Sequence, residues 1–192
     1  RAQQLEPGHP YHAYNRGNIQ LAFAQTLPEG QQQQVAANAA EALRQAFDLA
    51  PTDPQIARSL AQAHLLADNY EAARSMAEYL LTLRPNNPAN HLVLGHAYAE
   101  LGNLDAAEQA YQEALQLERP DRPSAEPYVA LGELARDQGD LMAARNWYSQ
   151  AVEAEPENWA LHYNLGLLYR DTGSLQEAIT ELSKAASVAP PE

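Results

Sequence analysis

Three pairs of glycines, with the members of each pair seven residues apart, constrain the fold of this chain more than any other feature. The pairs are Gly95 and Gly102, Gly132 and Gly139, and Gly166 and Gly173. Each pair lies in a stretch that otherwise favours helix, where a glycine costs about 1 kcal/mol relative to alanine. The second and third pairs are 34 residues apart, and a proline-rich loop lengthens the first interval to 37. A helical pattern that recurs at this period predicts a repeat protein built by stacking short units.

The pattern extends towards the amino terminus with substitutions. One period before the first pair stand Ala61 and Asp68, and aspartate tolerates the left-handed turn conformation. The unit at 10–53 has ten additional residues, from which we expect both of its helices to be about five residues longer and to meet at 28–30. We expect a single domain over 1–192 that begins within a repeat, which suggests a fragment or a processed product of a longer protein. Its predicted parts are the end of a preceding repeat at 1–9, a long atypical repeat at 10–53, and repeats at 54–87, 88–124, 125–158 and 159–192.

Helix boundaries are indicated by residues at fixed points of each unit. Good N-cap residues stand where each second helix should begin, because their side chains satisfy otherwise unpaired backbone amides. These residues are Asn69, Asn103, Asp140 and Ser174. Prolines stand where each second helix should end, because proline interrupts a helix. These residues are Pro51, Pro85, Pro120, Pro156 and Pro190.

The two glycines of a pair have different predicted roles. The first, such as Gly132, is expected where the two helices of a unit cross, facing a small residue so that the backbones approach closely. The facing residues are expected to be Ala73, Ala107, Ala144 and Ala178. The second glycine, such as Gly139, is expected to take a positive φ in the turn between the helices.

These features resemble the tetratricopeptide repeat family, which has the same small residues, turn glycine, aromatic residue in the second helix (Tyr111, Tyr148) and closing proline. The resemblance covers essentially the whole chain and is weakest at 10–53. It implies an all-α fold, a right-handed superhelical solenoid of stacked antiparallel helix hairpins, whose first helices line a concave groove for a peptide or a partner's helix. The groove residues implied by the family are Tyr14, Asn18, Gln55, Arg58, Gln62, Leu92, His96, Glu100, Val129, Glu133, Arg136, Tyr163, Leu167 and Arg170.

The implied function is a non-catalytic scaffold that binds a partner protein in this groove, within a larger bacterial assembly. The clamp by which some family members hold carboxylate tails is not expected, since Glu126 stands where that clamp needs a lysine. Two alternatives stay open. One is a scaffold that forms homo-oligomers through the apolar ends of the repeat array, and the other is a targeting or regulatory segment of a larger enzyme.

Composition limits the possible partners. The formal net charge of −13 and a single lysine, Lys184, argue against nucleic acid, because phosphate binding depends on lysine and arginine. Negative charge is highest over 88–124 and 125–158, which indicates either a solvated outer face or a docking zone for a basic segment. No apolar run is long enough to predict direct insertion into a membrane. The compartment, cytoplasmic or periplasmic, is left open.

Residues that carry catalysis or bind metals and cofactors are not grouped in the sequence. The chain has no cysteine and no glycine-rich phosphate loop. His91 and His96 are five residues apart, which places them on different sides of a helix. His64, His91 and His162 take packing positions, where a buried structural histidine is expected. We therefore expect no cofactor, no metal site and no enzymatic activity.

Overall fold

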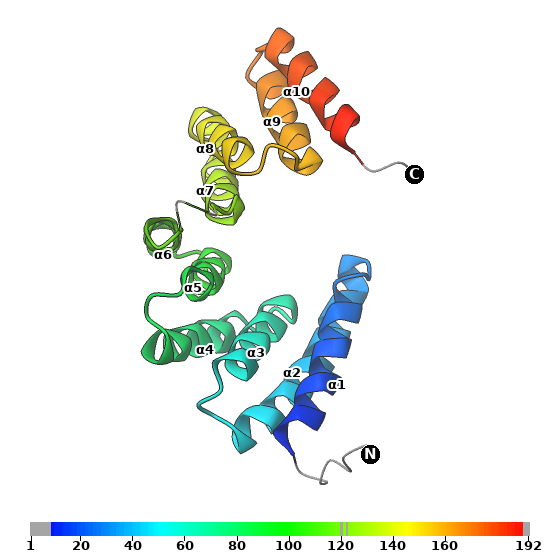
Figure 1. Ribbon diagram of the computed structural model, residues 1–192, viewed down its shortest axis with the longest axis vertical. Coiled ribbons are helices and arrows are strands. Elements are labelled where there is room, and N and C mark those ends of the chain that lie inside the picture. The colour runs from blue at the N-terminus through cyan, green and yellow to red at the C-terminus, as the bar shows by residue number, and fades with distance from the viewer. Residues whose placement is uncertain (1–8, 120, 122, 190–192) are drawn as a thin grey trace. The chain divides into compact units, whose positions relative to one another are not determined.

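The computed structural model describes residues 9–119, 121 and 123–189, and within these ranges it contains ten α-helices and no strand (Figure 1). The helices are α1 (Pro10–Ala24), α2 (Glu29–Leu49), α3 (Pro54–Leu66), α4 (Tyr70–Leu83), α5 (Pro88–Glu100), α6 (Leu104–Gln116), α7 (Glu126–Asp137), α8 (Leu141–Ala154), α9 (Trp159–Asp171) and α10 (Leu175–Val188). This succession confirms the predicted all-α repeat array. The chain divides into an N-terminal unit, Arg1–Ala107, and a C-terminal unit, Glu108–Glu192, with the boundary inside α6.

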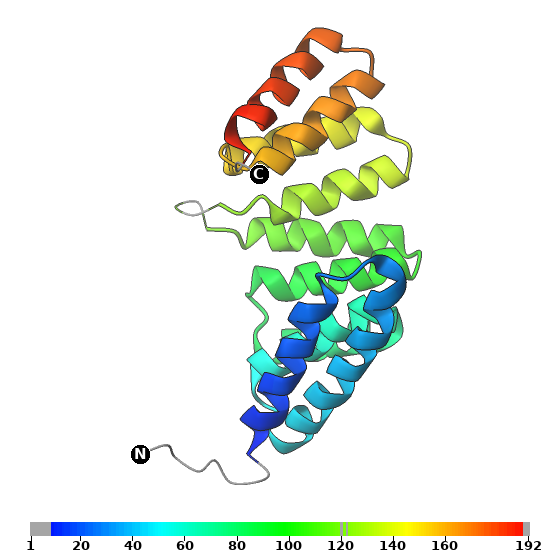
Figure 2. The same cartoon turned by 90° about the vertical axis from the view of Figure 1, so that its right-hand side faces the viewer.

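Each unit is built from helix hairpins that pack on one another in chain order. In the N-terminal unit α1 pairs with α2 and α3 with α4, while α2 also packs on α3 and α4 on α5. The first helices α1, α3 and α5 also contact one another in sequence. In the C-terminal unit α7 pairs with α8, α9 pairs with α10, and α8 packs on α9; these pairs can be followed in Figure 2. The second helices α2, α4 and α8 therefore each pack with one face on the first helix of their own hairpin and with another face on the next hairpin. The second helix α10 differs, because α9 is the only described helix of the C-terminal unit that it packs on.

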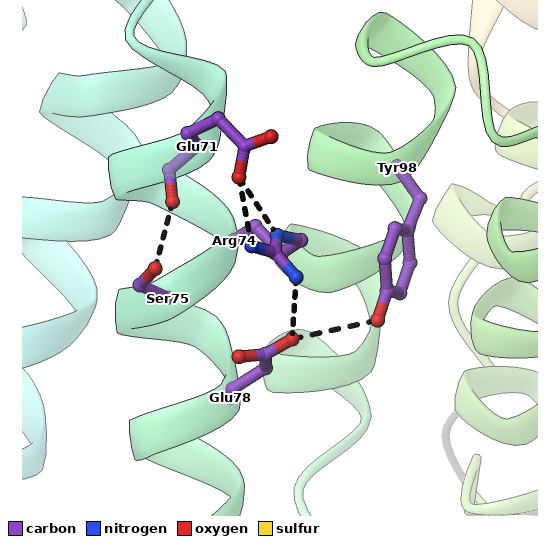
Figure 3. Close-up of polar contacts among 5 residues, drawn as sticks. All are labelled: Glu71, Arg74, Ser75, Glu78 and Tyr98. Atoms are coloured by element: carbon purple, nitrogen blue, oxygen red, sulfur yellow. Dashed lines mark hydrogen bonds and ion pairs between the residues drawn. The ribbon is translucent and has the colours of Figure 1, made fainter.

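The junction between successive hairpins brings an arginine of a second helix close to a tyrosine of the next first helix. In the N-terminal unit Nη1 of Arg74 donates to Oε1 of Glu78 at 3.3 Å, and the hydroxyl of Tyr98 donates to the same oxygen at 3.5 Å (Figure 3). In the C-terminal unit Cζ of Arg145 lies 5.4 Å from the centre of the Tyr169 ring, within range of a cation–π interaction. Because 71 residues separate the two arginines and also the two tyrosines, the junctions use equivalent points of the repeat.

The turns between paired helices have the predicted left-handed backbone. Gly102, Gly139 and Gly173 have φ values of 75°, 82° and 81°, and Asp68 at the same point of its repeat has φ 56°. A side chain at such a φ crowds the following carbonyl, so glycine is favoured and aspartate is tolerated. The predicted role of the second glycine is confirmed.

The first glycine of a pair lies at the helix crossing, but the residue opposite it is large. A Cβ atom built on Gly132 would lie 2.8 Å from Cδ2 and Cε2 of Tyr148, and one built on Gly166 would lie 2.8 Å from Cγ of Leu182. The alanines predicted to face these glycines stand four residues earlier on the same helices. That part of the prediction is wrong, because the missing Cβ makes room for a bulky side chain instead of a second small one.

The spacing of these crossing partners locates the extra residues of the first repeat. In the two C-terminal hairpins the large residue follows its glycine by 16 residues, whereas Leu43, which a Cβ on Gly17 would meet, follows Gly17 by 26. All ten additional residues therefore lie between the two crossing points. Where alanine replaces the glycine, at Ala61, the same 16-residue spacing leads to Ala77, and both alanines are fully buried. Two small residues therefore take the positions that a glycine and a large side chain hold in the two C-terminal hairpins.

The atypical first hairpin departs from the predicted geometry. Its helices α1 and α2 have 15 and 21 residues, whereas the other described helices have 12 to 14. The prediction of equal lengthening is wrong, since α2 takes most of the extension. Pro28 is the N-cap of α2, and Gly30 lies inside the first turn of that helix rather than between the helices.

Side-chain capping follows a different pattern from the predicted one. Asp140 accepts a hydrogen bond from the backbone nitrogen of Ala143 at 2.9 Å, whereas Asn69 and Ser174 are N-caps without a side-chain hydrogen bond. Asn103 directly precedes α6. The first helices are capped more regularly, by residues that accept from the backbone amide two positions later. These residues are Asp53, Asn87 and Asn158.

Prolines close the second helices as predicted. Pro51, Pro85 and Pro156 each stand two residues after the last residue of α2, α4 and α8. Pro120 and Pro190 lie outside the described residues.

Two of the predicted packing histidines tie these closing segments to the next helix. Nε2 of His91 donates to the carbonyl oxygen of Pro85 at 2.8 Å, and Nε2 of His162 donates to that of Pro156 at 2.9 Å. Both histidines are buried, while His64 is only partly buried. His91 and His162 therefore have the structural role expected from the sequence.

Candidate peptide-binding surface

The predicted groove residues of the N-terminal unit lie on its first helices α1, α3 and α5, with different exposures. The exposed ones are Gln55, Gln62 and Glu100, and the partly buried ones are Tyr14, Asn18, Arg58 and His96. Leu92 differs from the others because only 3% of it is exposed. A side chain so enclosed contributes to packing and offers almost no area to a ligand.

Arg58 is held by a polar contact between α3 and α5. Its Nη2 donates to Oδ1 of Asn90 at 3.1 Å, and Nδ2 of Asn90 donates to the carbonyl oxygen of Arg84 at 3.0 Å. Asn90 is fully buried, so these hydrogen bonds satisfy its side-chain amide, which water does not reach. Burial also lowers the pKa of His96 on α5, which favours its neutral form at neutral pH. His96 therefore carries little positive charge at neutral pH, whereas the hydrogen bond to the neutral Asn90 amide positions the Arg58 guanidinium without neutralising it.

The C-terminal unit presents a row of exposed aromatic and polar side chains along α9. Trp159 is 44% exposed and Tyr163 is 46% exposed, and they stand one helical turn apart. Leu167, which is partly buried, and exposed Arg170 continue the same side of the helix. We call these four residues the α9 stripe.

Trp159 was not among the predicted groove residues. The implied groove positions of this repeat begin at Tyr163, one turn further along α9. The spacing of four residues between Trp159 and Tyr163 was the signal that could have found it, because residues four apart share a helix face.

The predicted residues of α7 combine one apolar and two charged side chains. Val129 packs against a buried cluster that includes Leu161 of α9, which connects the two first helices of this unit. Glu133 and Arg136 are exposed. Desolvation raises the pKa of Glu133, although the positive charge of Arg136 acts in the opposite direction. The acidic group is therefore less well hydrated than an ordinary surface glutamate.

The two arginines of this unit's predicted surface form ion pairs with their chain neighbours. Nε of Arg136 lies 3.8 Å from Oδ1 of Asp137, and Nη2 of Arg170 lies 2.9 Å from Oδ1 of Asp171. All four groups are exposed, so each pair is worth only about 0 to 1 kcal/mol. A ligand carboxylate or carbonyl can replace the aspartate at little cost.

The described parts of the chain contain no arrangement typical of a metal centre or a membrane span. No group of three or more histidine or acidic side chains in these ranges is placed to hold a metal ion. None of the helices in the same ranges is both long and apolar enough to cross a bilayer.

Comparison with known proteins places this geometry in context. Two family models of the tetratricopeptide repeat match the chain, one at residues 31–88 and 129–192 and the other at 88–156. The chain is 30% identical over 146 residues to tetratricopeptide repeat protein 21A of Mus musculus, covering 73% of this chain and 11% of that protein. It is 37% identical over 97 residues to BBSome complex member BBS4 of Bos taurus, covering 50% of this chain and 18% of that protein.

A solved structure has the same fold. The thermophilic TPR protein TTC0263 of Thermus thermophilus superposes with a TM-score of 0.70 at 22% identity, covering 92% of this chain and 93% of that chain. The curated relatives are much longer, because the aligned region spans only 11% to 33% of the length of the first three.

Proposed function

Because the chain belongs to the tetratricopeptide repeat family, whose members mediate protein–protein interactions, we propose that it is a non-catalytic scaffold that binds a peptide or helix of a partner protein on its first helices. The observation that carries this proposal is the exposure of Trp159 and Tyr163 on one side of α9. Large aromatic side chains left half in water are typical of contact sites, because covering them with a ligand removes apolar area from solvent.

The composition of the α9 stripe supports the same role. Tryptophan, tyrosine and arginine are the residues most often found to dominate binding energy at protein interfaces, and the stripe contains one of each. Leu167 lies between Tyr163 and Arg170 and supplies apolar contact area. The stripe therefore combines two aromatic anchors with one charged group that orients a ligand.

Other predicted groove residues have smaller parts in this proposal. Gln62 and Glu100 in the N-terminal unit, and Glu133 in the C-terminal unit, are exposed and provide polar contacts. Arg58 and Leu92 have structural roles, since Arg58 is bonded to buried Asn90 and Leu92 is enclosed. The net charge of −13 favours a ligand that carries basic residues.

A binding experiment tests the proposal. Peptides selected from a random display library on the intact chain are labelled with fluorescein, and their affinity is measured by fluorescence anisotropy. We expect Trp159→Ala, and also the double variant Tyr163→Ala with Leu167→Ala, to raise Kd about 10- to 100-fold, as loss of an interface anchor does.

The matched control is Met142→Ala, which removes a side chain that is 53% exposed on the second helix α8. This variant should leave Kd within a factor of about two of the unmodified chain, because it lies off the first helices. If Trp159→Ala and the double variant bind the selected peptides as tightly as the control, the α9 stripe is not the binding surface.

A further inference from the structure

A cavity lies where α6, α7 and α8 meet in the C-terminal unit. Its volume is about 160 Å³, close to the roughly 150 Å³ of an apolar protein cavity that holds one benzene molecule. Leu131 and Leu134 of α7 and Trp147 of α8 give it apolar walls. We call this cavity the Trp147 pocket. Its size suits the end of one side chain and not a longer segment.

The polar groups of the Trp147 pocket are acidic. Glu108 of α6 and Asp140, the N-cap of α8, both line the pocket and are exposed. One oxygen of Glu108 accepts a hydrogen bond from Nε2 of Gln112 at 2.9 Å, and one oxygen of Asp140 accepts from the backbone nitrogen of Ala143 at 2.9 Å. Within the part of the chain that the structure describes, neither carboxylate has a second hydrogen bond or an ion pair. Each therefore keeps an oxygen that can accept from a ligand.

The N-terminal unit has a cavity at the same point of the repeat, but its lining differs. When the repeats are aligned on their crossing residues, Ala40 and Asn69 line that cavity at the positions of Glu108 and Asp140. Arg44 lines it as well, whereas none of the described residues that line the Trp147 pocket is basic. The pair of carboxylates is therefore particular to the Trp147 pocket and is not a general feature of the junction between hairpins.

We infer that the Trp147 pocket binds an arginine side chain of a partner protein. Tryptophan is the best aromatic partner for a cation, and carboxylates accept charge-assisted hydrogen bonds from a guanidinium. The aliphatic stem of the arginine contacts Leu131 and Leu134, while its guanidinium reaches Glu108 and Asp140. Arginine suits the pocket better than lysine, because its planar and weakly hydrated guanidinium stacks on an aromatic ring and donates in several directions.

The charge around the pocket favours the same ligand. The pocket belongs to the part of the chain where negative charge is highest, and a field of one sign attracts groups of the opposite sign. The arginines of α7 and α8 are engaged elsewhere, since Arg136 pairs with Asp137 and Arg145 lies over the ring of Tyr169. Neither of them lines the pocket, so a ligand supplies the positive charge that the two carboxylates lack.

A titration followed by nuclear magnetic resonance tests this inference. The probe is the peptide acetyl-Gly-Arg-Gly-amide at millimolar concentration, and its neutral isostere carries citrulline in place of arginine. The readout is the indole N–H signal of Trp147 in the ¹⁵N-labelled intact chain, which is assigned by its loss in Trp147→Phe. We expect the arginine peptide to shift this signal saturably and the citrulline peptide to shift it little. Added salt should weaken the binding, because it screens exposed charges.

Neutral variants of the two carboxylates test their part. We expect Glu108→Gln with Asp140→Asn to raise the Kd of the arginine peptide about threefold or more. Both replacements keep an oxygen that can accept the existing hydrogen bonds of Gln112 and Ala143, and asparagine is as good an N-cap as aspartate. Circular dichroism checks that the helix content is unchanged.

Two controls match these variants. Glu153→Gln with Glu157→Gln removes the same charge from exposed carboxylates that do not line the pocket, and Glu41→Gln removes a carboxylate that lines the N-terminal cavity. Both should leave Kd within a factor of about two. Absence of a saturable shift, an equal shift with the citrulline peptide, or equal weakening by Glu153→Gln with Glu157→Gln would overturn the inference.

The result is separable from the proposed function. No residue of the α9 stripe lines the Trp147 pocket. The double variant Tyr163→Ala with Leu167→Ala should therefore bind the arginine peptide as the unmodified chain does, although it weakens the peptides selected by display. Weakening of the arginine peptide by this variant would place its binding on the α9 stripe and overturn the assignment to the pocket.

Discussion

The crossing of α7 and α8 gives a sharp prediction, since Gly132 lacks the Cβ atom that would meet Tyr148. A Cβ there would lie 2.8 Å from two ring carbons of Tyr148 and 3.4 Å from Cβ of Trp147. The ring is buried, so it cannot swing into solvent. Gly132→Ala should therefore cost about 1 to 3 kcal/mol through overpacking, against a gain of about 1 kcal/mol from the better helix propensity of alanine. The expected net loss is about 1 kcal/mol.

The same substitution should have the opposite sign when the ring is absent. Tyr148→Ala alone should cost about 3 to 5 kcal/mol, because it leaves a cavity. In that background the new methyl group of Gly132→Ala meets no ring, so the variant keeps the gain of about 1 kcal/mol from helix propensity. The equivalent positions in the second hairpin, Ala61 and Ala77, are likewise two buried alanines. The double-mutant cycle should therefore give a coupling free energy of about 2 kcal/mol.

Urea unfolding of the four proteins, followed by far-ultraviolet circular dichroism, measures this coupling. Hydrogen exchange of the amides of α7 and α8 accompanies it, because stacked repeats can unfold in parts. If Gly132→Ala stabilises the chain equally with and without Tyr148, so that the coupling is within about 0.5 kcal/mol of zero, the steric account of the glycine is refuted.

Three further predictions concern the turns, the caps and the response to acid. Gly139→Ala should cost about 1 to 2 kcal/mol in urea unfolding because φ is 82°, whereas the control Gly30→Ala, in a helix with open space around it, should be neutral or stabilising. Asp140→Ala should lower the unfolding free energy by about 0.5 to 2 kcal/mol through loss of its cap hydrogen bond, and Ser174→Ala, which removes no such bond, should cost less. Burial alone would raise the pKa of Glu181, but hydrogen bonds from a buried histidine and a lysine outweigh it and lower the pKa below 4.5. The stability that Glu181 contributes is therefore present above pH 4.5 and lost as the pH falls through its folded pKa. Glu181→Gln should reduce the fall in melting temperature that accompanies acidification below pH 4.5, as measured in thermal melts. An equal fall in the variant and the unmodified chain would contradict this role of Glu181.

The helical repeat was predictable from the sequence because its signals are local. The positive φ at Gly102, Gly139 and Gly173 follows from a requirement of the backbone, and Asp68 satisfies the same requirement by a substitution that tolerates it. The closing prolines are equally local. Such residues act within a single turn of the chain, so the period of 34 was sufficient to place them.

The packing partners were harder to predict, because they depend on geometry between helices. The sequence indicated that Gly132 faces Ala144, whereas it faces Tyr148, one turn later. The spacing of small residues could not distinguish a close approach of two backbones from space for a ring. Likewise, the ten extra residues of the first repeat did not reveal that α2 takes most of them.

The candidate surface was only partly predictable. Tyr163 and Arg170 are exposed and remain candidates, but the burial of Leu92 depends on its neighbours in space and is not visible in its own helix. The exposure of Trp159 was missed because the family's groove positions do not include it. Exposure is a property of the assembled repeats, and helical periodicity indicates only which residues share a face.

The most direct test of the account is the fluorescence of Trp159 during binding. The chain has two tryptophans, so the variant Trp147→Phe leaves Trp159 as the only one. When a selected, tryptophan-free peptide is added, we predict that the emission maximum shifts to shorter wavelength in step with the anisotropy of the peptide, because the ligand removes water from the indole ring. Saturable binding with an unchanged emission maximum would show that the ligand binds elsewhere and would contradict the account.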